Sequence, residues 1–364
     1  MTAGIGPLPW QESVWSRLMA SLARDRLAHG LLVTGPVGVG KRLLAEGLAQ
    51  AILCQERSES GRACGGCRAC RLIAGSMHPD LSVVQPEDSR VIGIDQVRAL
   101  HDRLVLTSHA GGAKVAIVDL ADRLTAEAAN ALLKTLEEPP AGSQLIVCTA
   151  RPGLLPATVL SRCQRVVIQL PTPELGRAWL AERLAAPEHA EIALARAQGA
   201  PLRALREAAE AEGRDAMGDA EHLCRALQEV AGGVTDPVAL AAHWHERLAG
   251  PWQELGLERL LERLVTLLLD AARLKLADQP PRLVHPDLAA GLRRLAGPIH
   301  LRPLLRCVAT LEFARARARH PLNRQLVLED VLLAFHDAAR AARPPGPSPA
   351  GSGVPPRGWH DTYR

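Results

Sequence analysis

A glycine-rich turn between an apolar strand and a helix constrains this chain more than any other feature. The stretch from Leu31 to Ala49 reads LLVTGPVGVGKRLLAEGLA, in which Gly35, Gly40 and Lys41 match the phosphate-loop pattern G-x-x-x-x-G-K. In such a loop, backbone N–H groups and the N-terminus of the next helix converge on phosphate oxygens. The pattern predicts an α/β sheet that binds its ligand at the carboxyl ends of its strands.

The residue after the lysine departs from the phosphate-loop pattern. A Ser or Thr hydroxyl normally coordinates Mg²⁺ at this position. This chain has Arg42, and a guanidinium has no acceptor atom and is always charged. Two interpretations stay open: the turn is retained only for packing, or a degenerate site still binds nucleotide through Gly35, Gly38, Gly40 and Lys41.

A second departure concerns the residues that hydrolysis needs. The stretch KVAIVDLADRL should end the third strand, where hydrolytic relatives need Asp-Glu for the metal shell and for orienting water. Asp119 is present, but Leu120 occupies the Glu position, and Asp122 lies past the expected end of the strand. The two losses predict that this site does not hydrolyse ATP on its own.

Apolar runs that alternate with helical patterns predict a doubly wound parallel sheet over residues 1–170. The expected strands are Leu31–Thr34, Leu81–Val84, Val115–Asp119, Leu145–Thr149 and Val166–Ile168. The expected helices between them are Arg42–Leu53, Gln96–Leu106 and Ala126–Glu138.

No convincing strand follows Pro171 and Pro173, which break the chain. Residues 171–213 predict a small bundle of three helices at Glu174–Leu184, Ala190–Gln198 and Leu202–Glu212. Residues 214–341 predict a further all-helical domain. Residues 342–364 are rich in Pro, Gly and Ser, which predicts a disordered tail.

Four of the eight cysteines predict a metal site. Cys54, Cys64, Cys67 and Cys70 form C-x9-C-x2-C-x2-C, a spacing that suits tetrahedral Zn²⁺. An iron–sulfur cluster is the competing interpretation, although the ferredoxin motif continues with C-x3-C-P, which is missing after Cys70. A zinc ion bound by four thiolates would be structural, because no position stays open for a substrate.

Composition narrows the partners and the compartment. The net charge of +4 permits contact with nucleic acid without requiring it, and two Phe, one Tyr and six Trp offer few rings for base stacking. No run of about 18 apolar residues is present, which predicts no membrane partner. The first residues lack the pattern of a signal peptide, so we expect a cytoplasmic protein with reduced thiols.

Four motifs together resemble the AAA+ subunits of the bacterial DNA polymerase III clamp loader. They are GPVGVGK, VDLADRL, NALLKTLEEPP at Asn130–Pro140 and LPATVLSRC at Leu155–Cys163. The resemblance covers most of residues 1–210 and implies an AAA+ core, a small helical lid and a helical collar that forms a ring of five. It also implies a zinc module where the four cysteines lie. The altered nucleotide site favours the delta-prime branch over the gamma/tau ATPases, which keep the hydroxyl and the Glu.

The same resemblance assigns roles to three further residues. Arg162 of the SRC motif would reach in trans to the γ-phosphate held by a neighbouring subunit, as an arginine finger. Thr149 matches the sensor-1 position and Arg203 the sensor-2 position on the lid. In a site that does not hydrolyse ATP, the last two can equally be relics.

The leading hypothesis is a clamp-loader subunit of the DNA polymerase III holoenzyme, a DNA-directed DNA polymerase (nucleotidyltransferase). Its implied partners are the gamma/tau and delta subunits, primed DNA contacted without sequence preference, and the sliding clamp, indirectly. One alternative is an active gamma/tau-like ATPase, against which Arg42 and Leu120 argue. Another is a stand-alone zinc-dependent nucleic-acid-binding protein, which the mild charge and few aromatic residues disfavour.

Overall fold

The computed structural model describes residues 6–58, 60–87, 91–108, 112–211, 220–250, 252, 256–280, 282–318 and 323–341. The chain divides into two compact units, Met1–Glu212 and Gly213–Arg364. The tail expected at 342–364 lies outside the described residues. Within the described ranges, no helix is long and apolar enough to cross a membrane.

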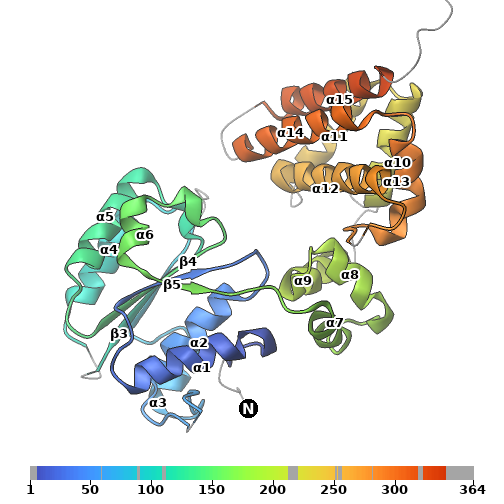
Figure 1. The fold of residues 1–364 in the computed structure, drawn as a ribbon. Coiled ribbons are helices and arrows are strands. Elements are labelled where there is room, and N and C mark those ends of the chain that lie inside the picture. The colour runs from blue at the N-terminus through green and yellow to red at the C-terminus, as the bar shows by residue number, and fades with distance from the viewer. Residues whose placement is uncertain are drawn as a thin grey trace, which may run out of the picture. The chain divides into compact units, whose positions relative to one another are not determined.

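A five-stranded parallel sheet forms the centre of the first unit (Figure 1). Across the sheet the order is β2-β3-β4-β1-β5. The strands are β1 (Gly30–Thr34), β2 (Leu81–Val84), β3 (Lys114–Val118), β4 (Ser143–Thr149) and β5 (Gln164–Val167). The predicted parallel α/β sheet is confirmed, and the ends of the five strands differ from the predicted ones by two residues at most.

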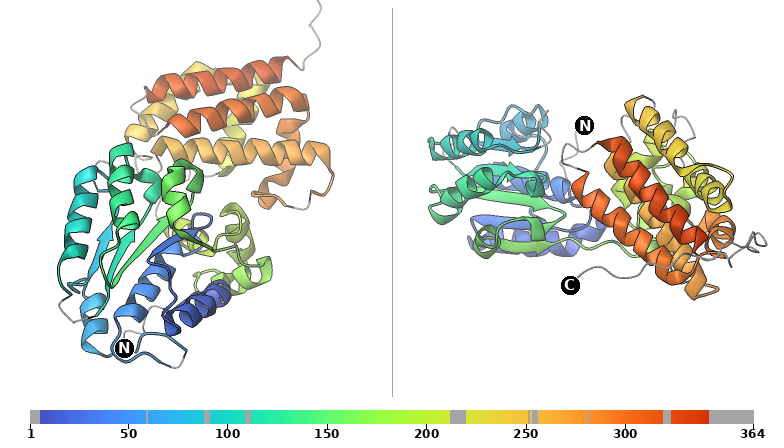
Figure 2. Two further views of the ribbon diagram at one scale, coloured as in Figure 1. Left: turned by 60° about the vertical axis from the view of Figure 1, so that its left-hand side comes forward. Right: turned by 90° about the horizontal axis from the view of Figure 1, so that it is seen from above.

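Helices cover both faces of this sheet, and its inner strands β1 and β3 are buried in every residue. Leu31 and Val33 of β1 pack in one buried layer with α1 and α2, whereas Leu32 packs in the other with α4, α5 and α6 (Figures 1 and 2). The α-helices of this part are α1 (Glu12–Ala23), α2 (Lys41–Leu53), α3 (Arg68–Ala74), α4 (Ile94–Val105), α5 (Ala126–Glu137) and α6 (Ala157–Arg162). The 3-10 turns are η1 (Pro9–Gln11), η2 (Ala121–Arg123) and η3 (Pro152–Leu154).

Three short helices follow the sheet in the first unit. They are α7 (Pro173–Ala181), α8 (Ala190–Arg196) and α9 (Pro201–Ala211), with the turn η4 (Pro187–His189) before α8. Leu180 and Leu194 form their buried core. The ring of Trp179 meets that of Trp10 edge-on, with centroids 5.3 Å apart, so the helices also pack against the N-terminal segment.

In the described residues of the second unit, helices are the only regular secondary structure. Its helices are α10 (Ala220–Gly232), α11 (Pro237–Ala249), α12 (Gly256–Leu276), α13 (Ala289–Ala296), α14 (Leu301–Arg317) and α15 (Arg324–Arg340), with the turn η6 (Pro286–Leu288). α12 packs against α13 and α14, and α11 packs against α15. α14 and α15 lie side by side in Figures 1 and 2. A single apolar cluster joins all six helices, so each one buries its apolar stripe against its neighbours.

Candidate functional site

The glycine-rich turn has the backbone of a phosphate loop. Gly38 and Gly40 have φ of +85° and +84°, in the left-handed region that glycine adopts without strain. The turn leads into α2, which begins at Lys41. The Lys41 Nζ donates to the carbonyl oxygens of Gly35 at 2.9 Å and Pro36 at 2.7 Å. Burial of this ammonium group lowers the pKa of Lys41, because the charged form loses its hydration.

Two other segments hold the loop from outside. Gln11 Nε2 donates to the carbonyl oxygens of Val39 at 2.8 Å and Gly40 at 2.9 Å. The backbone N–H of Leu202, on α9, donates to the carbonyl oxygen of Gly38 at 3.1 Å. A Cβ added at Gly38 would lie 2.5 Å from the Cβ of Arg203, so glycine is required there for α9 to approach.

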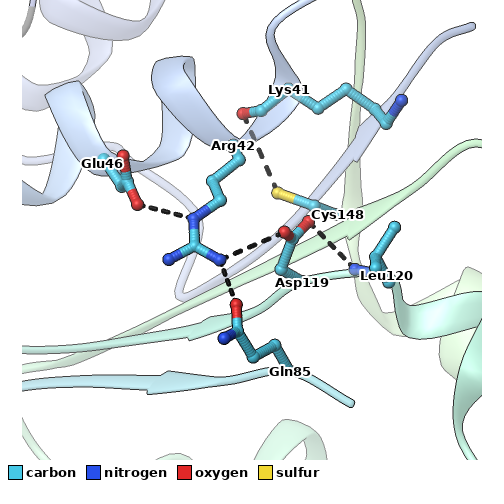
Figure 3. A network of polar contacts seen from close by, with 7 residues as sticks. All are labelled: Lys41, Arg42, Glu46, Gln85, Asp119, Leu120 and Cys148. Carbon is cyan, nitrogen blue, oxygen red and sulfur yellow. Dashed lines mark hydrogen bonds and ion pairs between the residues drawn. The ribbon is translucent and has the colours of Figure 1, made fainter. Parts of the chain in front are cut away.

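Arg42 lies where a phosphate loop normally has its metal-binding hydroxyl. Figure 3 shows its guanidinium pointing toward Glu46, Asp119 and Gln85, which belong to α2 and to the ends of β3 and β2. Its Nε donates to Glu46 Oε1 at 2.7 Å, and its NH1 lies 3.5 Å from Asp119 Oδ2 and donates to Gln85 Oε1. The Lys41 ammonium points away from this group. Lys41 therefore contacts the phosphate loop, whereas Arg42 contacts acidic residues of α2 and of the end of β3.

Asp119 and Leu120 follow β3, where the sequence predicts an incomplete hydrolytic pair. Asp119 Oδ1 accepts the backbone N–H of Leu120 at 2.9 Å. Leu120 has a φ of 53° and is 44% exposed, so it presents an apolar side chain where a general base would stand. Mg²⁺ does not fit this donor set, because a guanidinium replaces the hydroxyl ligand and already contacts the one strand carboxylate.

The two sensor positions make contacts within the chain. Thr149, at the end of β4, donates from Oγ1 to Asp122 Oδ1 at 2.9 Å and accepts the backbone N–H of Arg151 at 3.0 Å. Arg203 Nε donates to Glu207 Oε1 at 2.7 Å, one turn along α9. Thr149 lies at the same edge of the sheet as Asp119, whereas Arg203 approaches the loop through its backbone.

Arg162 ends α6, away from the phosphate loop. Its NH2 lies 2.7 Å from Glu137 Oε1, and its NH1 donates to the Thr158 carbonyl oxygen at 3.1 Å. Glu137 is the last residue of α5, which Thr125 caps at its start. Glu138 and the two prolines of LEEPP follow and end the helix, which leaves Glu137 next to Arg162. The side chains of Arg162 and Glu137 are 37% and 49% exposed. Arg162 is thus a surface cation with a local partner.

The four clustered cysteines come together in space. Their sulfur atoms all lie within 4.8 Å of one another, with 3.9 Å between Cys54 and Cys67 and 4.0 Å between Cys64 and Cys70. Tetrahedral zinc with bonds of about 2.3 Å requires sulfur atoms about 3.8 Å apart. This group of thiols could therefore hold a zinc ion.

Hydrogen bonds prepare one of these thiols for metal binding. Burial acts to raise the pKa of Cys67, but the backbone N–H of Cys70 and neighbouring donors outweigh it and lower the pKa to about 6. The cap at the start of α3 supplies this N–H, since the Cys67 sulfur accepts it. Of the four isolated cysteines, Cys148, Cys224 and Cys307 are buried and Cys163 is half-buried.

Several site residues were not predicted from the sequence. Glu46 could have been found, because it lies one helical turn from Arg42. Gln85, Gln11 and Glu137 come from distant segments and become visible only once the sheet order and the helix ends are known.

Comparison with known proteins places both units in one family. The family model for "DNA polymerase III, delta subunit" matches residues 10–172, and the model for "DNA polymerase III, delta subunit, C terminal" matches residues 215–337. The DNA polymerase III subunit delta′ of Escherichia coli is 34% identical over 329 residues, which cover 89% of this chain and 94% of that protein.

Two further proteins are similar to this chain. The delta′ subunit of Pseudomonas aeruginosa is 42% identical over 201 residues, 54% of this chain and 60% of that protein. This chain thus spans less than two thirds of the Pseudomonas relative. A solved structure from Thermotoga maritima, of a DNA polymerase III gamma-subunit-related protein, is 20% identical and covers 89% of this chain and 100% of that one, with a TM-score of 0.43.

Proposed function

We propose, because the chain belongs to the delta-prime family of DNA polymerase III clamp-loader subunits, that it is a ring subunit without ATP turnover in its own site. It would assemble with gamma/tau and delta subunits and present Arg162 to the nucleotide of a neighbouring ATPase subunit. In this way it would couple a neighbour's hydrolysis to the loading of a sliding clamp on primed DNA.

The pairing of Asp119 with Arg42 is the observation that carries the first part of this proposal. Phosphoryl transfer needs a metal to neutralise the charge that develops on the phosphates, and a base or polar group to orient water. Here the strand carboxylate contacts a guanidinium 3.5 Å away, and Leu120 offers no proton acceptor. Bound nucleotide in this site would therefore persist rather than turn over.

The environment of Arg162 supports the second part. Its ion pair with Glu137 is largely exposed, and exposed pairs contribute about 0–1 kcal/mol. A triphosphate carries more charge than one carboxylate and offers a bidentate contact, so exchange of Glu137 for a phosphate group would be favourable. The position at the end of a helix on the surface also leaves the guanidinium within reach of a neighbouring chain.

The remaining assignments follow from the family and from the metal-ligand geometry. The four cysteines would hold a structural zinc ion that fixes the segment between α2 and α3. Lys and Arg side chains would contact DNA phosphates, so DNA binding within the complex would depend on salt and not on sequence. Contact with the clamp would be indirect, and the complex would act in the cytoplasm.

The test is steady-state ATP hydrolysis by a complex reconstituted from this chain with gamma/tau, delta, clamp and primed DNA. Arg162→Ala should reduce turnover at the adjacent ATPase site by about 10³-fold, as for other arginine fingers, and Arg162→Lys should rescue little because lysine lacks the planar fork. Arg165→Ala removes an exposed arginine three residues away and serves as the matched control.

Two results would reject the proposal. One is measurable hydrolysis by the isolated chain, which would make it an ATPase in its own right. The other is normal turnover in an Arg162→Ala complex that gel filtration shows to be fully assembled.

A further inference from the structure

Three acceptors from three separate elements surround the Arg42 guanidinium. Glu46 comes from α2, Asp119 follows β3 and Gln85 follows β2 (Figure 3). Two of them are carboxylates and one is an amide oxygen. A set of hard oxygen donors on converging elements is the environment that a divalent cation takes in a nucleotide site.

The guanidinium also neutralises the negative charge of the Asp119 carboxylate, as a metal ion would. Asp119 has one oxygen engaged by the Leu120 N–H at 2.9 Å and the other facing Arg42 NH1 at 3.5 Å. A Mg²⁺ ion here would have to displace a fixed positive charge from the carboxylate or sit beside it. An arginine does not deprotonate in proteins and is part of the chain, so its positive charge stays at the site whatever the concentration of free metal ions.

We propose that the Arg42 guanidinium permanently occupies the divalent-cation position of this phosphate loop, so that Mg²⁺ adds nothing to the affinity of the chain for ATP. The side chain links the start of α2 to the ends of β2 and β3, as a bridging metal would. Arg42 is thus more than a missing ligand: it replaces both the hydroxyl and the metal. This inference rests on the proposed absence of turnover and extends it to the cation.

The loop next to this cation keeps the geometry for phosphate. Gly38 and Gly40 have the left-handed conformation found in anion-binding backbone nests, and α2 begins directly after them. The two acceptors of Lys41 Nζ, at Gly35 and Pro36, are neutral carbonyl oxygens. The replacement of the hydroxyl by Arg42 therefore affects only the part of the site where a metal would bind, and Arg42→Ser should reverse it.

The experiment measures ATP binding to the full-length, zinc-loaded chain by calorimetry, with and without MgCl₂, in buffer freed of divalent ions by resin so that no chelator strips the cysteines. The unmodified chain should give the same result in both buffers. Arg42→Ser restores the hydroxyl and frees Asp119, so ATP should bind at least about tenfold more tightly with Mg²⁺ than without it. In the double variant Arg42→Ser/Asp119→Asn this Mg²⁺ dependence should disappear.

Two outcomes overturn the proposal: Mg²⁺ dependence in the unmodified chain, or none in a folded Arg42→Ser. An arm that needs no variant is Mn²⁺ electron paramagnetic resonance of the unmodified chain with ATP. It should show no protein-bound Mn²⁺, and a bound ion would refute the replacement. These measurements use the isolated chain, whereas the Arg162 test reads a neighbouring subunit in the complex, so either idea can fail alone.

Discussion

The most severe loss of stability should come from a buried carboxylate in the helical unit, Asp270 on α12. Its side chain is fully buried. Its Oδ2 accepts the backbone N–H groups of Val284 at 2.8 Å and His285 at 2.7 Å and lies 3.2 Å from the His285 Nδ1. Its Oδ1 accepts from Arg273 at 2.9 Å. One side chain therefore ties the segment before η6 to the longest helix.

The cost of Asp270→Ala follows from which donors lose their acceptor. The two backbone N–H groups are buried and would stay unpaired, at about 1–3 kcal/mol each, which gives about 4 kcal/mol together. Arg273 is 42% exposed and can turn to water, so its part is small. Asp270→Asn can keep its oxygen toward both N–H groups and should cost about 1–2 kcal/mol. Arg273→Ala should cost less than about 1 kcal/mol.

Hydrogen exchange of the full chain, followed by mass spectrometry, measures the loss of stability segment by segment. This suits a protein of two units better than a single melting temperature. A loss of about 4 kcal/mol corresponds to exchange about 10³-fold faster in peptides of α12 and residues 282–288, with the β-sheet peptides unchanged as internal control. If Asp270→Ala accelerates exchange no more than Arg273→Ala, the carboxylate does not hold these N–H groups and the reasoning is wrong.

Two further predictions concern the sheet and the cysteines. Leu120→Gly should stabilise the first unit by about 0.5–1 kcal/mol, measured by urea unfolding. Glycine removes about 1–2 kcal/mol of left-handed backbone strain, and the higher entropy of the unfolded chain offsets only part of this gain. Leu120→Ala keeps the Cβ and should not stabilise the unit, so equal effects of the two substitutions would exclude strain as the cause. The purified chain should contain about one zinc ion by elemental analysis, lost in Cys67→Ser and retained in Cys148→Ser. Acid should release the metal because the thiols must stay deprotonated, and visible absorbance from iron would contradict the zinc assignment.

Strand prediction succeeded because parallel strands covered on both faces must be apolar along their length, as Leu31, Leu32 and Val33 illustrate. The ends were less accurate because tertiary contacts decide them. β4 begins at Ser143, two residues earlier than its apolar run, since Gln144 is buried and donates to the carbonyl oxygens of Ala28 and His29 at 2.7 and 3.0 Å. A polar residue with buried partners cannot be distinguished from a loop residue by pattern alone.

Helices α1, α3 and α6 of the first unit were not predicted from the sequence, and the reasons differ for the first two. α1 carries Val14, Leu18 and their neighbours at helical spacing, so its amphipathic signal was present in the sequence. α3 has only seven residues, and its fold depends on the cysteine cluster, because the Cys67 sulfur caps its first turn. The cysteine spacing predicted the four-thiol group without revealing the helix that presents its last member, Cys70.

The nucleotide site shows where sequence reasoning stops and what completes it. That position 42 lacks a metal ligand follows from the residue type alone, but where the guanidinium goes depends on the sheet order β2-β3-β4-β1-β5. The phosphate loop follows β1, whereas Asp119 follows β3, with the end of β4 between them. A short hydroxyl needs a metal to bridge that distance, whereas the long side chain of Arg42 reaches Asp119 directly. Once the order of the strands is known, the sequence pattern can be interpreted. An arginine directly after the loop lysine, with an acidic residue one helical turn later, predicts that a side chain of the protein supplies the positive charge of the divalent cation.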